Sequence, residues 1–247
     1  GYSKRVSMSS RDIMTEHDDV AARVAAHVAK GARVLIIRNT VTSCVALQRT
    51  LEACEDTRPH LFRCYGTPCP HHGRYAATDR KALDAALEGQ LGKRAPRDGA
   101  LVVVATQTVE QSLDIDADVL ITDLCPVDVL LQRIGRLHRH PRRIRPAGYE
   151  AASCIVLTPE GSDLGAFLKR DGATSRQPGT GTGTGSGSVY EHVLILEATR
   201  RLIDRTPVWD IPRMNRALVE ECTHPEALAS LAGRLGDEKW QKHLDHL

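Results

Sequence analysis

The chain has 247 residues, with 33 Lys and Arg against 31 Asp and Glu, so its formal net charge is +2. This balance excludes a polybasic protein, and any nucleic-acid site must be local. Aromatic residues make up 4% of the chain, which argues against rows of base-stacking rings. No apolar run reaches 18 residues, so we expect no membrane span. Seven scattered cysteines predict reduced thiols and a cytoplasmic location, and a start at Gly1 suggests that the chain is cut from something longer.

Short apolar runs alternate with helical patterns along the first two thirds of the chain. We expect strands over residues 33–38, 61–65, 101–105, 119–124 and 152–157. We expect helices over residues 20–28, 41–54, 76–91 and 127–137. This order predicts βαβ units, and therefore an α/β fold with a parallel sheet that is flanked by helices. Chemistry in such a sheet belongs at the carboxyl ends of the strands.

The composition changes near residue 170. Residues 179–188 read GTGTGTGSGS, which predicts a flexible tether or an exposed insertion. Beyond it we expect a helix over 189–203, a proline-punctuated link over 206–212, and one or two helices over 224–247. The expected division is a main domain over 1–170, a linker over 171–188 and a helical C-terminal segment over 189–247.

Several well-known motifs are absent from the sequence. There is no G-x-x-x-x-G-K-[ST] phosphate loop, no G-x-G-x-x-G and no G-x-S-x-G. The adjacent His17 and Asp18 lack the companion ligands of a metal site and favour a helix start. A second cluster, Cys64, Cys69, His71 and His72, leaves a cramped zinc site open, although we favour a loop without metal.

Residues 129–149 form a basic window. It holds six arginines and no Asp or Glu, and the arginines are Arg133, Arg136, Arg139, Arg142, Arg143 and Arg145. If the helix that begins near residue 127 continues, Gln132, Arg136 and Arg139 share one face. Guanidinium groups fit phosphate oxygens bidentately, so the window predicts either a phosphate site or a solvated basic helix.

A polar stretch, Thr106 to Asp116, follows the clearest expected strand directly. Thr106 and Gln107 have the hydrogen-bonding groups for a sugar-phosphate backbone, and Asp114 can accept from a ribose hydroxyl. The alternative is a loop in which Thr and Asp side chains cap neighbouring helices.

Together these stretches resemble a known family. ATQTVEQSLDIDADVLITDLCPVDVLLQRIGRLHRH resembles motifs V and VI of superfamily-two helicases, and most closely the CRISPR-associated helicase-nucleases of type I interference systems. Asn39-Thr40-Val41 resembles motif IV, and His72-Gly73-Arg74-Tyr75 with Asp79-Arg80 resembles a further family segment. Asn215–Val219 is a weaker match. The resemblance covers about residues 30–160 and is most specific over 105–140.

The resemblance implies two RecA-like domains with ATP and Mg²⁺ between them, and this sequence matches only the second domain. Carried over by motif, Gln132, Arg136 and Arg139 address the γ-phosphate, and Asp114 holds the ribose or couples to that face. Asn39, Thr40, Arg74, Thr106 and Gln107 lie along a single-stranded DNA track. The Mg²⁺ ligands belong to the absent first domain, so this chain alone is expected to be inactive. Arg133 is instead a candidate internal partner of Glu110.

The family also implies partners and leaves alternatives. The expected partners are single-stranded DNA, the first RecA-like domain and a CRISPR surveillance complex, without a membrane. Two other readings remain open at this point. One is a RecA-like module that binds nucleic acid or a partner without hydrolysis, and the other is an RNA helicase domain of the same superfamily.

Overall fold

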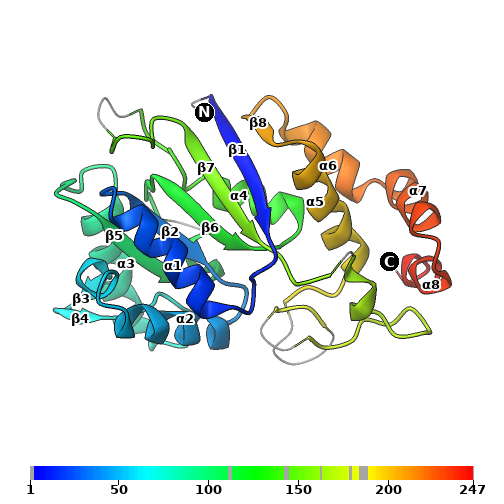
Figure 1. The fold of residues 1–247 in the computed structure, drawn as a ribbon, viewed down its shortest axis with the longest axis horizontal. Helices are drawn as coiled ribbons and strands as arrows, with labels where there is room; N and C mark the ends of the chain where they lie inside the picture. Colours follow the sequence, from blue (N-terminus) through cyan, green and yellow to red (C-terminus); the bar gives the residue numbers. More distant parts are fainter. Residues whose placement is uncertain are drawn as a thin grey trace.

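A six-stranded sheet forms the centre of the protein. The computed structural model describes residues 3–110, 113–141, 145–161, 163–177, 180–183 and 189–246. The strand order is β5-β2-β6-β7-β1-β8 (Figure 1). The strands are β1 (Lys4–Arg11), β2 (Arg33–Ile37), β5 (Leu101–Ala105), β6 (Val119–Asp123), β7 (Ala152–Leu157) and β8 (Val208–Ile211). A separate hairpin pairs β3 (Arg63–Cys64) with β4 (Thr67–Pro68).

The sheet is parallel except at one edge. β2 pairs in parallel with β5 and β6, and β7 pairs in parallel with β6 and β1. β8 runs antiparallel to β1 and closes that edge. Every residue of β2, β5 and β6 is buried, as expected for parallel strands that are covered on both faces. The α/β fold expected from the sequence is confirmed.

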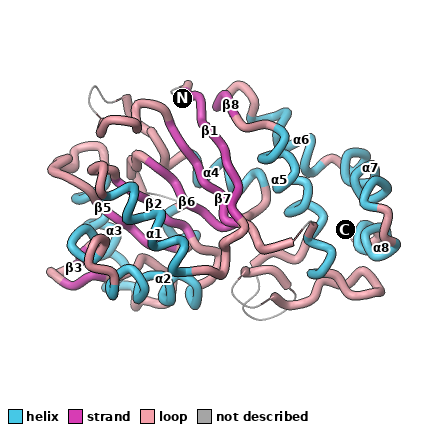
Figure 2. Tube along the Cα trace, viewed as in Figure 1, coloured by secondary structure: helices cyan, strands magenta, loops and turns pink. Residues whose placement is uncertain are grey.

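Helices cover the sheet and extend beyond one edge. They are α1 (His17–Val28), α2 (Val41–Ala53), α3 (Ala77–Leu91), α4 (Val127–Ile134), α5 (Val193–Arg205), α6 (Asn215–Thr223), α7 (Pro225–Leu235) and α8 (Glu238–Leu244). α1 lies across one face of the sheet in Figure 1 and contacts α2 and β2. Figure 2 shows α6, α7 and α8 beside the β1–β8 end of the sheet.

Local sequence explains several of these helix boundaries. The Thr40 hydroxyl accepts a hydrogen bond from the Ser43 backbone N–H at 3.0 Å and so caps α2. α1 begins at His17, so the His17–Asp18 pair opens a helix as expected. Pro225 occupies the first turn of α7, and Gly236 ends it in the left-handed conformation.

Five elements differ from the sequence expectations. β1, β8 and α6 are additional elements, and α4 ends at Ile134 rather than at residue 137. β1 has only Val6 and Met8 facing the core, so its sequence lacks a continuous apolar run. β8 lies between two prolines, which an edge strand tolerates. Over the expected strand 61–65, Leu61 makes an isolated parallel bridge to Val102 of β5, and β3 pairs with β4 in a short hairpin.

Part of the Gly/Thr tract is packed against the domain. Thr180 and Thr182 are buried, and the Thr180 carbonyl accepts a hydrogen bond from Asn39 at 2.9 Å. A Cβ on Gly181, whose φ is +82°, would lie 2.8 Å from the Cβ of Asn39, so this close approach requires glycine. A flexible tether is therefore wrong for residues 180–183, because their polar groups are hydrogen bonded inside the protein. The rest of the tract, 179 and 184–188, lies outside the described residues.

None of the helices in the described ranges has the length and apolar character that crossing a bilayer requires.

Candidate functional site

Asn39 lies inside the domain, at the point where β2 ends. Its side chain is 1% exposed, and its Nδ2 donates to the Leu124 carbonyl at 2.8 Å as well as to Thr180. Its Oδ1 accepts from Nη1 of Arg133 at 3.1 Å. Both polar atoms are therefore occupied by the protein. The structure does not bring this expected DNA contact to the surface.

Arg133 anchors α4 through a buried ion pair. Its Nε lies 2.7 Å from the Glu110 carboxylate, and the two side chains are 0% and 9% exposed. Its other nitrogens reach the Thr122 hydroxyl at 2.7 Å and the Tyr190 hydroxyl at 3.1 Å. The expectation that Arg133 is an internal partner of Glu110 is confirmed.

Arg136 follows the end of α4 and is held by backbone carbonyls. Its Nη1 donates to the Leu113 carbonyl at 2.5 Å, and its Nη2 donates to the Glu110 carbonyl. Within the described residues no carboxylate pairs with Arg136, and its buried Nε has no hydrogen-bond partner. Burial, and then the charge of Arg139, lower the pKa of Arg136, which nevertheless stays cationic because an arginine starts so high. Arg136 therefore keeps a positive charge and an unused donor.

Arg139 and Asp114 meet at the surface. The Nε of Arg139 lies 2.6 Å from Oδ1 of Asp114, and the side chains are 38% and 47% exposed. His140 also reaches Asp114, at 2.8 Å. Partial burial acts to raise the pKa of Asp114, but hydrogen bonds from Arg139 and His140 outweigh it and leave this pKa below its usual value. The resemblance implied that Asp114 holds the ribose or couples to the face of Arg139, and the structure brings Asp114 and Arg139 into direct contact.

Gln132, Arg136 and Arg139 do not share a helical face. Gln132 is exposed on the last turn of α4, and the chain leaves the helix at Gly135. The Ala117 N–H donates to the Arg136 carbonyl at 3.0 Å, and the His138 N–H donates to the Ala117 carbonyl at 3.1 Å. His138 takes a left-handed conformation with φ of 45°. Strand-like pairing with residue 117 thus replaces the expected helix continuation.

Acidic residues from outside the basic window neutralise much of its charge. Arg145 pairs with Asp116 at 3.0 Å and with Asp118 at 2.6 Å. With the Arg133 and Arg139 pairs, the 110–118 stretch supplies the carboxylates that the window lacks. Although the window holds no Asp or Glu of its own, the fold thus pairs Arg133, Arg139 and Arg145 with carboxylates. Arg142 and Arg143 lie outside the described residues.

The remaining expected nucleic-acid residues differ in exposure. Arg74 is exposed, Thr40 and Gln107 are half-buried, and Thr106 is 2% exposed. The Gln107 amide donates to the Asn39 carbonyl at 2.9 Å, which ties the turn after β5 to the end of β2. Arg74, Thr40 and Gln107 thus have side chains that reach the surface, whereas Thr106 does not.

The His and Cys cluster is engaged by protein groups. Both nitrogens of His71 lie within hydrogen-bond distance of side chains, at 2.8 Å from Thr108 and 2.7 Å from Asp84. The described residues contain no group of three or more His, Cys, Asp or Glu side chains placed to hold a metal ion.

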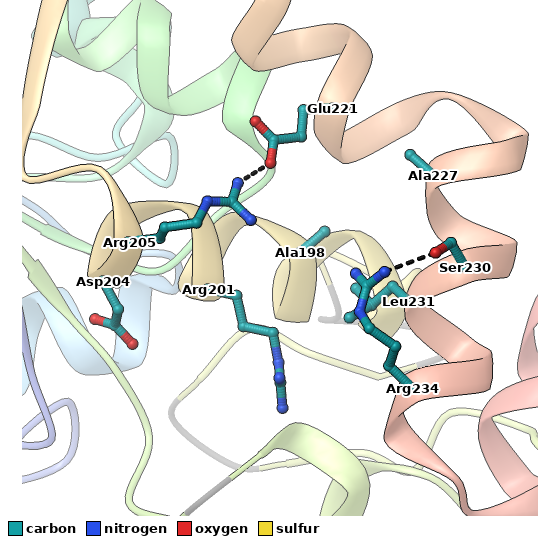
Figure 3. Close-up of a pocket in the computed structure, with 9 residues that line it drawn as sticks. All are labelled: Ala198, Arg201, Asp204, Arg205, Glu221, Ala227, Ser230, Leu231 and Arg234. Carbon is teal, nitrogen blue, oxygen red and sulfur yellow. Dashed lines mark hydrogen bonds and ion pairs between the residues drawn. The ribbon is translucent and has the colours of Figure 1, made fainter.

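A cavity of about 770 Å³ lies between α5, α6 and α7, in a region that the sequence did not single out. Figure 3 shows Arg205 of α5 directed at Glu221 of α6, and Arg234 directed at Ser230 of the same helix, α7. Arg201, also on its wall, pairs with Glu197 at 2.5 Å. Because two of its three arginines are paired with carboxylates, the cavity offers little positive charge for a ligand.

Comparisons with known proteins bear on the motif region and on the fold. Residues 30–142 match the family model described as CRISPR-associated nuclease/helicase Cas3, C-terminal. Residues 30–142 are therefore similar to the C-terminal part of Cas3 nuclease/helicases. The CRISPR-associated endonuclease/helicase Cas3 of Escherichia coli K12 is 38% identical over 143 residues, which are 58% of this chain and 15% of that protein.

Solved Cas3 structures match almost the whole chain. The crystal structure of T. fusca Cas3-AMPPNP aligns with a TM-score of 0.71 and 26% identity, over 98% of this chain and 27% of that one. A chain of a CRISPR RNA-guided surveillance complex, pre-nicking, aligns with a TM-score of 0.66 and 25% identity, over 98% and 28%. The chain therefore spans 15% of the E. coli relative and about a quarter of the solved chains.

Proposed function

We propose that this domain is the second motor domain of an ATP-dependent translocase that moves on single-stranded DNA in CRISPR interference. The similarity to Cas3 nuclease/helicases supports helicase function, and the T. fusca relative was solved with the nucleotide analogue AMPPNP. A relative within a CRISPR RNA-guided surveillance complex supports such a complex as a partner of the intact protein, which we expect in the cytoplasm.

Arg136 carries the nucleotide part of this proposal. Arg136 is 8% exposed, its guanidinium is held by carbonyl oxygens, and its buried Nε has no partner among the described residues, so a side-chain shift on domain closure would present it to a phosphate oxygen. Gln132 and Arg139 are exposed, and Asp114 orients Arg139. We assign Arg136 the role of arginine finger, with Arg139 and Gln132 beside the γ-phosphate and Asp114 near the ribose.

The physical basis is charge placement. ATP supplies a terminal phosphoryl group whose oxygens carry negative charge in the transition state, and a cation placed there accelerates transfer. An arginine finger contributes a factor of about 10³–10⁵ in rate. The phosphate loop and the Mg²⁺ ligands would come from the first RecA-like domain, so we expect the chain alone not to hydrolyse ATP. Hydrolysis is thereby coupled to closure of the two domains.

The DNA part of the proposal rests on three side chains. Arg74, Thr40 and Gln107 supply a guanidinium, a hydroxyl and an amide at the surface, with Asn39 and Thr106 supporting them from within. Such groups contact phosphate and sugar and carry no sequence information, which suits a motor that travels on any sequence.

Replacement of Arg136 in the intact protein tests the proposal. Arg136→Ala should lower DNA-stimulated ATP hydrolysis about 10³-fold or more, while the Kd for ATP changes by less than about threefold. Arg136→Lys keeps the charge without the planar fork and serves as the matched variant; it should recover only part of the rate. Unchanged turnover of Arg136→Ala would refute the finger role. Equal or greater stimulation of the wild-type protein by RNA would instead favour an RNA helicase.

A further inference from the structure

His71 joins three segments that are distant in sequence. It lies between β4 and α3 and is fully buried. Its backbone N–H donates to the Val104 carbonyl at 2.8 Å, and its carbonyl accepts from the Thr106 N–H at 2.9 Å. Its Nδ1 lies 2.8 Å from the Thr108 hydroxyl and its Nε2 lies 2.7 Å from Oδ1 of Asp84. One residue thus contacts the end of β5, the turn after β5, and α3.

The surroundings set the protonation of this imidazole. Burial lowers the pKa of His71, against the opposing effect of Asp84, and Arg80 lies 3.6 Å from the same carboxylate. At neutral pH the imidazole is therefore uncharged. Asp84 accepts a hydrogen bond, so the ring proton is on Nε2 and Nδ1 is an acceptor. The Thr108 hydroxyl lies 2.8 Å from Nδ1 and 3.2 Å from the His71 carbonyl, so both of its acceptors belong to His71. Asp84 thereby fixes the tautomer that holds Thr108.

The held turn is the one that carries Gln107. Gln107–Val109 forms a single turn of 3₁₀ helix directly after β5. On its other side, a Cβ on Gly73 would lie 3.7 Å from the Thr108 methyl carbon, so the segment that carries Arg74 packs against the same threonine. The positions of the two surface residues, Gln107 and Arg74, therefore both depend on one contact, between Thr108 and His71.

We propose that His71 is a positioning residue for the nucleic-acid surface: with its ring fixed by Asp84, it holds Thr108 so that Gln107 and Arg74 face single-stranded DNA in a single arrangement. This inference rests on the proposed function, because it assigns His71 a role in DNA binding through other residues. A hydrogen-bonded link through a neutral, buried imidazole can position these groups without a conformational cost when DNA arrives.

Four variants of the intact protein test this role. Thr108→Val removes the hydroxyl with little change of shape, His71→Gln removes the acceptor at Nδ1, and Thr108→Ser restores the hydroxyl. Thr57→Val is the matched control, because Thr57 is also buried and donates to a backbone carbonyl at 2.7 Å, but lies between α2 and β3. The measurements are the single-stranded DNA concentration that gives half-maximal ATP hydrolysis, kcat at saturating DNA, the KM for ATP, and hydrogen exchange of the 106–109 amides.

The expected result separates positioning from general destabilisation. Thr108→Val and His71→Gln should raise the half-activating DNA concentration about 3- to 10-fold, the effect of one hydrogen bond, with kcat and the KM for ATP within about twofold. They should also speed exchange at 106–109, and the double variant should be no worse than the worse single variant. Thr108→Ser should return the DNA concentration to near the wild-type value, and Thr57→Val should leave it unchanged.

Hydrogen exchange and DNA-stimulated hydrolysis test the positioning role and the proposed function separately. Exchange at 106–109 that matches wild type in Thr108→Val would overturn the positioning role, and so would an unchanged half-activating concentration in both variants. If wild-type hydrolysis shows no response to DNA, the proposed function fails, and the DNA role of His71 fails with it. The exchange experiment would then still decide whether His71 holds the turn.

Discussion

The guanidinium of Arg133 and the carboxylate of Glu110 lie 2.7 Å apart in the interior, whereas Arg136, three residues further along, has no carboxylate partner among the described residues. The same short stretch of sequence thus supplies one arginine with a carboxylate partner for internal support and one, Arg136, that we propose binds an external anion. Both arginines are buried, so carboxylate pairing rather than burial or residue type distinguishes them.

Removal of one member of the buried pair should be costly. Arg133→Met leaves Glu110 without its cation and leaves Asn39 and Thr122 without a donor, so we expect a loss of about 3–5 kcal/mol in the free energy of unfolding. Adding Glu110→Gln should recover at least about 1 kcal/mol, because the uncompensated charge is then gone. Urea unfolding of the two variants measures both numbers. A double variant that is no more stable than Arg133→Met would contradict a direct pair.

Asn39→Ala should affect stability rather than DNA binding. It removes both donors to the carbonyls of Leu124 and Thr180 and the acceptor for Arg133, so we expect a loss of about 1–3 kcal/mol. The Kd of the folded intact protein for single-stranded DNA should stay within about twofold. A large loss of affinity without a loss of stability would show that Asn39 contacts DNA after all.

Arg74→Ala should weaken DNA binding through a phosphate contact. We expect the slope of log K against log salt concentration to fall by about 0.7, the value for one phosphate contact on a single strand. Arg216, which is 89% exposed on α6, provides the matched control, because Arg216→Ala removes the same charge far from the β2 and β5 ends. Fluorescence anisotropy titrations at several salt concentrations give both slopes. Equal slopes for Arg74→Ala and wild type would remove Arg74 from the DNA surface.

His138 should make the protein less stable in mild acid. Burial, followed by the charge of Arg145, lowers the pKa of His138 to about 4. The unfolded chain, with a histidine pKa near 6.5, binds this proton first as pH falls. Stability therefore rises with pH between about 4 and 6.5 and falls on acidification through that window. Between pH 7 and pH 5 the loss due to His138 should be about 2 kcal/mol.

His138→Asn isolates this contribution. Asparagine tolerates the left-handed backbone conformation at φ of 45° and does not titrate. Other histidines with a lowered pKa, such as His27 and His243, are present in both proteins and cancel in the difference. Urea unfolding at the two pH values should show a smaller pH-dependent loss in the variant. An identical loss would mean that His138 is protonated in the native state.

The central strands were predictable because their sequences are continuous β-branched or apolar runs. The elements that sequence reasoning missed have different physical origins. β1 buries only alternate residues, and β8 is four residues long between prolines. The end of α4 is decided by pairing of Arg136 and His138 with Ala117, a tertiary contact that no pattern within residues 127–140 reveals.

The sequence indicated which segments contain the candidate site, but it did not indicate which side chains in those segments are exposed. The resemblance assigned roles to Asn39, Thr106 and Arg136, yet their exposure depends on packing against distant residues; Asn39, for example, is hydrogen bonded to Thr180. The basic window lacked acids of its own, but folding brings Glu110, Asp114, Asp116 and Asp118 against it. The role of His71 had no signal beyond its place beside the recognised segment, because Asp84 and Thr108 come together only in the fold.

The antiparallel strand β8 has a practical consequence for spectroscopy. The two tryptophans of the chain, Trp209 in β8 and Trp240 in α8, are both buried. Intrinsic fluorescence therefore monitors the closing edge strand and the last helix, whereas far-ultraviolet circular dichroism averages over the whole backbone. Coincident melting curves from the two signals would mean that the terminal helices and the sheet unfold as one cooperative unit. A fluorescence transition at a lower temperature would mean that β8 and α8 detach before the rest of the protein unfolds.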